Sequence, residues 1–397
     1  MRAAKDVAKR LLAARGYEVR RLRPRGRPDT LERPWALLSF HRPWVLTADD
    51  DLLAHKGHAI LRDDRELARA LVAQGYNVRG VHWLDRGFHP DRPYEVVMDV
   101  GAGLERLARE LPAGCVKLLY LIFSDPYYHN AAEQERVLAL NERRGAACRP
   151  RRRIQEPEAI RRALDLCDAA LLNGNEHTLA TYPPEHHHKM QLVTSPGSFI
   201  GTHGKPPGAL APDEREFLWF FGAGAAHKGL DLVLEVFARH PELTLHVVGG
   251  ALLQDPDFVR AYRRELTELE NIHVYGQLPP NGRELAALTR RCCALVAPSC
   301  AEAGSPAVVT CLKIGLYPIV SRDCGITVPE GAGTLLETCS IDEIEDAVLR
   351  VHRLTAAELR TAVAAAQADA LRRFTPEAYR RTVDHFLQRM LGRRDAS

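Results

Sequence analysis

From residue 35 onward, short apolar runs alternate with stretches whose apolar residues recur at helical spacing. The runs predict strands at residues 35–40, 76–83, 94–101, 116–124, 169–174 and 191–195. The stretches between them predict helices near residues 61–74, 104–111, 131–144 and 156–167. Alternating strands and helices at this spacing are typical of a parallel sheet covered by helices on both faces. The first half of the chain is therefore predicted to be a Rossmann-like domain.

The same alternation resumes after residues 196–214, a segment rich in Gly and Pro without periodicity. Strands are predicted at residues 216–222, 243–250, 272–276, 294–299 and 317–321, and helices at 229–240, 257–269, 282–292 and 306–315. The predicted fold class is α/β, with two Rossmann-like, doubly wound domains that face a central cleft. Open α/β sheets bind ligands outside the carboxyl ends of their strands, so we expect the chemistry in this cleft.

Beyond Leu336 the pattern is helical, and Thr375-Pro376-Glu377 opens a last helix with Thr as its N-cap and Pro in its first turn. The pattern thus divides the chain into five parts. These are residues 1–34 (a basic helix and linker), 35–200 (the first domain), 201–214 (a linker), 215–372 (the second domain) and 373–397 (the C-terminal helix).

Composition narrows the function classes. Of 397 residues, 46% are hydrophobic and 26% charged, and the net charge of +3 is too small to favour nucleic acid as a partner. The nine cysteines form no CxxC pair, which predicts reduced thiols and no disulfide framework or zinc ribbon. No uncharged apolar stretch approaches the roughly 18 residues of a membrane span, and the N-terminus lacks the features of a secretory signal. We expect a cytoplasmic protein.

Charge is concentrated locally at the start of the chain. The first 28 residues carry ten Lys and Arg against two acidic residues. Ala4, Val7, Ala8, Leu11 and Leu12 fall at helical spacing between the basic residues, which predicts an amphipathic basic helix. Two uses remain open: binding to an anionic membrane surface, or packing on the body of the protein as a solvated helix.

Two motifs in the second half carry candidate chemistry. A glycine-bearing turn at Gly222 and Gly224 leads to Lys228-Gly229 at a helix start, where an exposed lysine and the helix dipole favour phosphate. Further along, Pro298-Ser299 ends a strand, and Glu302 precedes the helix that begins at Pro306. Taken singly, each motif also fits a plain reading, namely a turn with a surface lysine and an acid favoured by a helix dipole.

Together, in this order and at this distance, the motifs resemble the donor-nucleotide half of GT-B glycosyltransferases, specifically glycosyltransferase family 4. The resemblance is strong over residues 216–340 and only architectural over residues 35–200. It rests on Gly222, Lys228-Gly229, Gly249, Gly276, Pro298-Ser299, Glu302, Pro306 and Gly315. It implies retaining transfer from a nucleotide-activated sugar, no cofactor or obligatory metal, and a C-terminal helix that crosses back to the first domain.

The resemblance also implies roles for individual residues. Lys228 would bind the donor phosphates, Glu302 the donor-sugar hydroxyls, and Gly276 and Gln277 would lie beside the base. The other donor-binding positions that it implies are Gly57, Gly222, Gly224, Gly249, Gly304, Ser305, Ala307, Val308 and Thr310. Two positions depart from the family: Ala223 stands where an arginine is common, and Thr310 where a second glutamate usually accepts hydrogen bonds from the ribose.

On the acceptor side, family members often place a histidine after the strand at residues 116–124. Here Asp125 occupies that place, with His129 as the competing candidate, and Asp125 alternatively starts a turn before Pro126. The predicted catalytic residues are Asp125, Lys228 and Glu302; His129 and Asn175-Glu176 are predicted to face the acceptor. His186-His187-His188 has no carboxylate or Cys pattern to complete a metal site, so no metal is predicted.

The expected function is that of a retaining glycosyltransferase in cell-surface polysaccharide synthesis. It would move a sugar from a nucleotide-diphosphate sugar to a glycan or lipid-linked acceptor, with residues 1–28 at the inner face of the membrane. The alternative, suggested by Ala223 and Thr310, is a non-catalytic sugar-nucleotide-binding subunit of a glycan assembly system. An epimerase on the same fold is a third reading.

Overall fold

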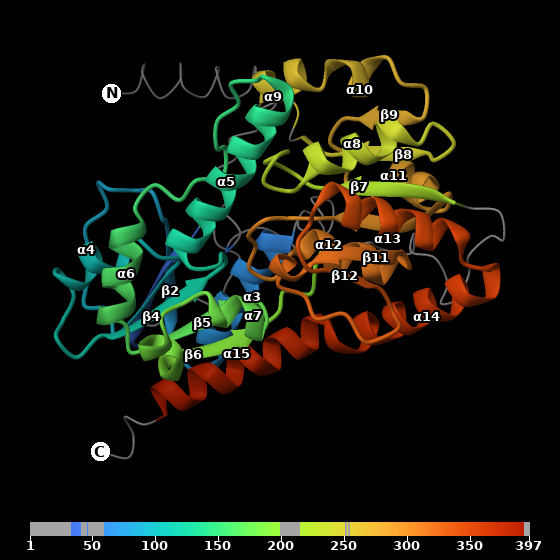
Figure 1. The fold of residues 1–397 in the computed structure, drawn as a ribbon. Helices are drawn as coiled ribbons and strands as arrows, with labels where there is room; N and C mark the ends of the chain where they lie inside the picture. The colour runs from blue at the N-terminus through green and yellow to red at the C-terminus, as the bar shows by residue number, and fades with distance from the viewer. Residues whose placement is uncertain are drawn as a thin grey trace, which may run out of the picture.

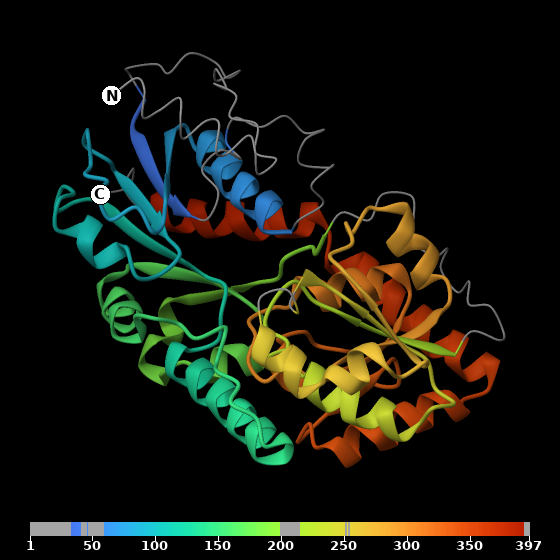
Figure 2. The same cartoon turned by 90° about the horizontal axis from the view of Figure 1, so that it is seen from above.

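The structure is a computed structural model that describes residues 33–40, 46, 59–198, 215–250, 252 and 255–392. Two six-stranded parallel sheets lie in two halves of the molecule (Figures 1 and 2). The segment 1–28, Gly57 and the linker 201–214 lie outside the described residues. None of the helices in the described part of the chain is long and apolar enough to cross a bilayer.

The first sheet has the strand order β2-β1-β3-β4-β5-β6. Its strands are β1 (Trp35–Phe40), β2 (Asn77–His82), β3 (Val96–Asp99), β4 (Val116–Leu121), β5 (Ala169–Asn173) and β6 (Met190–Val193). The helices of this half are α3 (Ala59–Ala73), α4 (Leu104–Ala108), α5 (Pro126–Arg144), α6 (Pro157–Leu166) and α7 (Glu176–Ala180), with the 3-10 turn η2 (Pro184–Lys189). All five residues of β5 are buried, as expected for a parallel strand covered on both faces.

The second sheet has the order β12-β11-β10-β7-β8-β9. Its strands are β7 (Glu216–Phe220), β8 (Leu245–Val248), β9 (Ile272–Tyr275), β10 (Cys292–Ala297), β11 (Tyr317–Ser321) and β12 (Thr334–Leu336). The helices after residue 215 are α8 (Leu230–Arg239), α9 (Pro256–Ala261), α10 (Arg263–Thr267), α11 (Arg283–Thr289), α12 (Pro306–Ile314), α13 (Ile341–Arg353), α14 (Ala356–Arg373) and α15 (Pro376–Leu391), with the 3-10 turn η4 (Arg322–Cys324). The predicted fold class, two parallel α/β domains, is confirmed.

The last helix, α15, returns to the first sheet, where it packs against α3, β5 and β6 (Figure 1). Alternate residues of β1 and β4 point to this face, and they share one apolar cluster with Tyr379, Val383 and Phe386 of α15. The remaining β4 residues point to the opposite face, toward α4 and α6. The crossing C-terminal helix is therefore part of the first domain's core, as the sequence predicts.

Two helices differ most from their predicted extents. The helix predicted near residues 131–144 begins earlier, at Pro126, because the Asp125 side chain accepts the amide hydrogens of Tyr127 and Tyr128 and so caps it. The helix predicted at residues 257–269 is divided into α9 and α10 at Tyr262, whose ring is fully buried.

The C-terminal part of α5 leaves the first half and packs on the second (Figure 2). Val137, Leu140 and the following Cys148 belong to the apolar core built on β7 and α8. Arg143 donates to Asp231 at 2.8 Å and to Glu235 at 2.9 Å, and both acids lie on α8. Helix α5 therefore connects the two halves.

Candidate functional site

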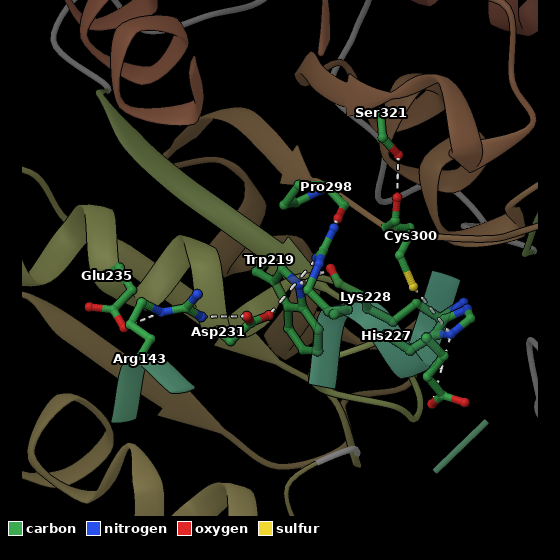
Figure 3. A network of polar contacts seen from close by, with 12 residues as sticks. Arg143, Trp219, His227, Lys228, Asp231, Glu235, Pro298, Cys300 and Ser321 are labelled. Atoms are coloured by element: carbon green, nitrogen blue, oxygen red, sulfur yellow. Dashed lines mark hydrogen bonds and ion pairs between the residues drawn. The ribbon is translucent and has the colours of Figure 1, made fainter. Parts of the chain in front are cut away.

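A lysine and a glutamate from two loops of the second half meet at the carboxyl ends of the strands. The turn between β7 and α8 carries Lys228, and the loop after β10 carries Glu302; their side chains form an ion pair. Gly229 has a φ of 72°, and a Cβ there would overlap the Pro298 carbonyl, so glycine permits the two loops to approach this closely. The Trp219 indole donates to the Lys228 carbonyl at 3.0 Å (Figure 3).

Lys228 is buried, with only 8% of the residue exposed. The expectation of an exposed lysine is therefore wrong, because Glu302 and the glycine-permitted loop contact enclose the side chain. Burial is the main cause that lowers the pKa of Lys228 well below its ordinary value, and the positive charge of nearby Arg152 lowers the pKa further. The Lys228 ammonium is consequently held in a poorly hydrated place where an anionic ligand interacts with it strongly.

The N-terminus of α12 lies at the end of the loop that carries Glu302. The Gly304 and Ser305 amides donate to the carbonyls of Asn173 and Cys324, both at 2.9 Å. Pro306 has no amide hydrogen, while the Ala307 and Val308 amides have no partner among the described residues. Of the backbone positions predicted to bind phosphate, these two are thus available, at the positive end of the helix dipole.

The predicted glycines gather at the ends of β7, β8 and β9. The space around Gly222 and Gly276 is open, whereas a Cβ at Gly249 would overlap the Phe221 carbonyl. The Gly249 amide donates to the Gly276 carbonyl at 3.2 Å, and the Gln277 side chain lies against Gly250. These turns form one small-residue edge beside Lys228, which is the predicted place of the nucleotide.

Arg152, from the loop after α5, reaches the same turn. Its side-chain carbons lie so close to Gly224, which has a φ of 79°, that a Cβ on this glycine would overlap them. The Arg152 side chain is exposed, and no described residue forms an ion pair with it. An arginine from the first half therefore contacts the residue after Ala223, the position where the resemblance leads one to expect an arginine.

Thr310 is fully buried on α12. Its hydroxyl donates to the Pro306 carbonyl at 2.6 Å and accepts from the Ser198 amide at 2.9 Å. Both bonds are internal, so the Thr310 side chain anchors the segment after β6 to α12.

On the first half, Asp125 is engaged in structural contacts. Besides capping α5, its carboxylate forms an ion pair with Arg161 at 2.7 Å, and the residue is 1% exposed. His129, its competitor, lies one turn further along α5, and its ring packs on that of His227 with centroids 4.6 Å apart. Burial lowers the pKa of His129 to about 4. His129 therefore contacts the second half through His227, the residue before Lys228. Of the two catalytic candidates on this strand and helix, it is the one that meets the second half.

Asn175 and Glu176 lie on a cavity of about 260 Å³ between the two halves. Asn175 caps α7 and donates to the Thr327 hydroxyl at 3.4 Å across the interface. The cavity is lined by Gly174, Asn175, Glu176, Leu192, Thr194, Gly325, Ile326, Thr327, Arg373 and Phe374. Of the three residues predicted to face the acceptor, Asn175 and Glu176 thus share one interdomain cavity, whereas His129 does not line it.

Residues 205–368 match the family model described as glycosyl transferases group 1. The chain contains a glycosyltransferase group 1 domain. Lys228, Glu302 and the N-terminus of α12 all lie within the matched range. No curated protein sequence matches the chain.

Solved structures share the fold of both halves. A sucrose-phosphate synthase from Thermosynechococcus elongatus has a TM-score of 0.65 at 15% identity, over 91% of this chain and 100% of that one. Anabaena HepE in complex with UDP and glucose has a TM-score of 0.58 at 13% identity, over 90% and 100% of the two chains. WaaG, a glycosyltransferase involved in lipopolysaccharide biosynthesis, has 0.54 at 16% identity, over 90% and 100%. The two facing sheets form the GT-B fold.

Sequence reasoning missed four residues that the structure places around Lys228. They are Glu133, Arg136, Arg152 and His227. Arg136 donates to the Pro298 carbonyl at 3.1 Å, and His227 donates to the Ala301 carbonyl at 2.5 Å. The spacing of His129 and Glu133, four residues apart on one helix, was a local signal that both share a face. Nothing local pointed to the other three.

Proposed function

We propose that the protein is a retaining glycosyltransferase that takes its sugar from a nucleotide-diphosphate sugar. The observation that carries this proposal is the ion pair between buried Lys228 and partly buried Glu302, beside the two α12 amides that have no partner among the described residues. A cation, a helix N-terminus and a carboxylate within one small-residue edge suit a ligand that joins a diphosphate to a sugar. The complex of Anabaena HepE with UDP and glucose makes a uridine donor the first to test.

Donor binding would exchange the partners of the pair. The diphosphate would bind the Lys228 ammonium and the amides of Ala307 and Val308. Glu302 would then lose Lys228 as its partner and accept hydrogen bonds from sugar hydroxyls. When the bond between the sugar and the phosphate breaks, negative charge grows on the diphosphate. The preorganised cation and amides stabilise this charge, so the chain's contribution is positioning and electrostatics. Turnover is expected without added Mg²⁺ or Mn²⁺.

Arg152 adds a second positive charge to this edge. Because the Arg152 side chain contacts this turn from the first half, donor binding would draw on both halves of the protein. Asp125 has no part in this scheme, since its carboxylate is used for capping and for the ion pair with Arg161. Thr310 is likewise assigned no ribose contact.

The acceptor would enter from the side of the first half. The cavity that contains Asn175 and Glu176 offers amide, carboxylate and hydroxyl groups, which suit the hydroxyls of a glycan. We propose a glycan or lipid-linked acceptor in cell-surface polysaccharide synthesis, with the protein in the cytoplasm at the inner face of the membrane. The second candidate, a non-catalytic sugar-nucleotide-binding subunit, is favoured by the internal bonding of Thr310.

A donor panel followed by turnover separates these candidates. Purified protein is first melted with UDP, GDP and their sugars; a ligand at 100 times its Kd stabilises the folded state by about 2.7 kcal/mol. The stabilising donor is then incubated with the wild type and with Glu302→Gln, and release of the nucleotide is measured. We expect nucleoside-diphosphate binding by both proteins and much slower release by Glu302→Gln. Binding without any release by the wild type supports the subunit, and no binding refutes both candidates.

A further inference from the structure

Three buried side chains with metal-binding atoms meet between α5 and the turn before α8. His129 and Glu133 come from one face of α5, and His227 comes from the turn that also carries Lys228. One ligand atom of each lies within 4.8 Å of those of the other two, and all three residues are buried. The cluster is assembled from both halves of the chain, so it exists only in the folded, docked protein.

Both histidines are held in a defined tautomer. The Nε2 atom of His129 donates to the Arg152 carbonyl at 3.0 Å, and that of His227 donates to the Ala301 carbonyl. A carbonyl oxygen only accepts, so each hydrogen sits on Nε2 and each Nδ1 keeps its lone pair. A carbonyl partner on the second ring nitrogen is the arrangement that orients metal-binding histidines.

The Nδ1 atoms of the two histidines differ in their surroundings. Nδ1 of His129 is buried and has no hydrogen-bond partner among the residues that the structure describes. Nδ1 of His227 lies 3.8 Å from Oε1 of Glu133, and it accepts a weak hydrogen bond from the Cys300 thiol at 3.6 Å, which a metal ion would replace (Figure 3).

Glu133 is oriented in a similar way. Its Oε1 accepts from the Arg151 and Arg152 amides at 2.9 and 2.7 Å, which fixes the carboxylate at the end of its side chain. Its Oε2 is buried without a partner in the described part of the chain. Orphaned buried acceptors are rare in folded proteins, and two of them in one cluster indicate that a cationic ligand belongs there.

We propose that His129, Glu133 and His227 bind one divalent transition-metal ion, with zinc as the best fit, and that this ion ties α5 to the turn carrying Lys228. Two imidazole nitrogens and one carboxylate oxygen are a donor set that zinc uses in proteins, and imidazole disfavours Mg²⁺ and Ca²⁺. Two cations lie nearby: Lys228 is paired with Glu302, and Arg152 is solvent-exposed. The ion is structural and takes no part in the transfer step, so this inference does not rest on the proposed function.

Metal uptake by the full-length, untagged protein tests the site without any nucleotide. Protein stripped with a chelator and dialysed is titrated with Zn²⁺ against a competing chromophoric chelator, and its melting temperature is measured with Zn²⁺ and with Mg²⁺. We expect one Zn²⁺ per chain and a higher melting temperature with Zn²⁺ but not with Mg²⁺. Glu133→Gln keeps an oxygen for the two amides but loses the charge, and it should weaken Zn²⁺ binding about tenfold or more.

The histidine run at residues 186–188, which lies outside the cluster, provides the matched control. The double variant His186→Ala, His188→Ala should bind Zn²⁺ as the wild type does. Three results would overturn the proposal: no uptake by the wild type, uptake that this control variant loses, or equal affinity in Glu133→Gln. Should Glu133→Gln fail to fold, as judged by circular dichroism, the wild-type stoichiometry and the control variant still decide. UDP binding is measured separately, so failure of the metal site leaves the proposed function untouched.

Discussion

Helix α5 offers a direct test of how the two halves are connected, because it carries two leucines in opposite surroundings. Leu140 is fully buried in the core of the second half, whereas Leu138 is 50% exposed. Replacing a buried leucine by alanine removes apolar contacts and leaves a cavity, at a cost of about 2–5 kcal/mol. The same change at an exposed position costs within about 0.5 kcal/mol. Both positions are in the helix interior, so helix propensity cancels in the comparison.

The assay is urea unfolding of the wild type, Leu140→Ala and Leu138→Ala, followed by far-ultraviolet circular dichroism and tryptophan fluorescence. We expect Leu140→Ala to lower the urea midpoint clearly and Leu138→Ala to leave it near the wild-type value. Trp219, buried in the second half, should report the change although the mutated residue precedes that half in the chain. If the two variants unfold at the same midpoint, α5 is not anchored in the second core and the reasoning fails.

Three further predictions concern binding. Lys228→Ala should weaken nucleoside-diphosphate binding by about tenfold or more, since charge-assisted hydrogen bonds contribute about 1.5–3 kcal/mol; calorimetric titration measures this. The same variant should have a lower melting temperature, because Glu302 is left without its partner; melting curves measure this. Burial lowers the pKa of Lys228, so the ammonium loses its proton as pH rises through this lowered pKa. Diphosphate affinity should therefore fall at a pH below 10.5, the pKa of an ordinary lysine. In the same titrations, the affinity of Lys228→Ala should not show this fall with pH. Deleting residues 1–28 should abolish salt-sensitive sedimentation with anionic liposomes; equal sedimentation of both proteins would remove the membrane role.

Much of the fold follows from local patterns. The strand predicted at residues 35–40 coincides with β1, and Thr375-Pro376 does open the last helix, with the Thr375 hydroxyl accepting the Ala378 amide. Buried parallel strands read as short apolar runs, and caps depend on a few adjacent residues, so both are visible in one sequence. The early start of α5 had the same kind of signal, since Asp125-Pro126 is a helix-start pair as well as a turn.

The candidate site was less accessible because its properties depend on distant residues. A lysine at a helix start is ordinarily exposed. No residue close to Lys228 in the sequence indicates that Glu302 covers its side chain. Arg152 approaches Gly224 only because α5 carries the following loop onto the second half. The pairing of His129 with His227 likewise joins elements from different domains. Tertiary packing decided each of these features, and packing leaves no periodic trace in the sequence.

The return of α15 to the first sheet has a consequence for the order in which the protein matures. Tyr379, Val383, Phe386, Leu387 and Leu391 complete an apolar face whose other members include Leu38 and Leu71. A ribosome makes Leu38 and Leu71 early and the α15 residues only after the second half. This apolar face therefore stays uncovered while the second half is being synthesised. The second half, although made later, holds its own core residues in one continuous stretch apart from the contribution of α5, which has by then been made. During synthesis the second half is therefore expected to reach its native packing before the first, which must wait until α15 has been made.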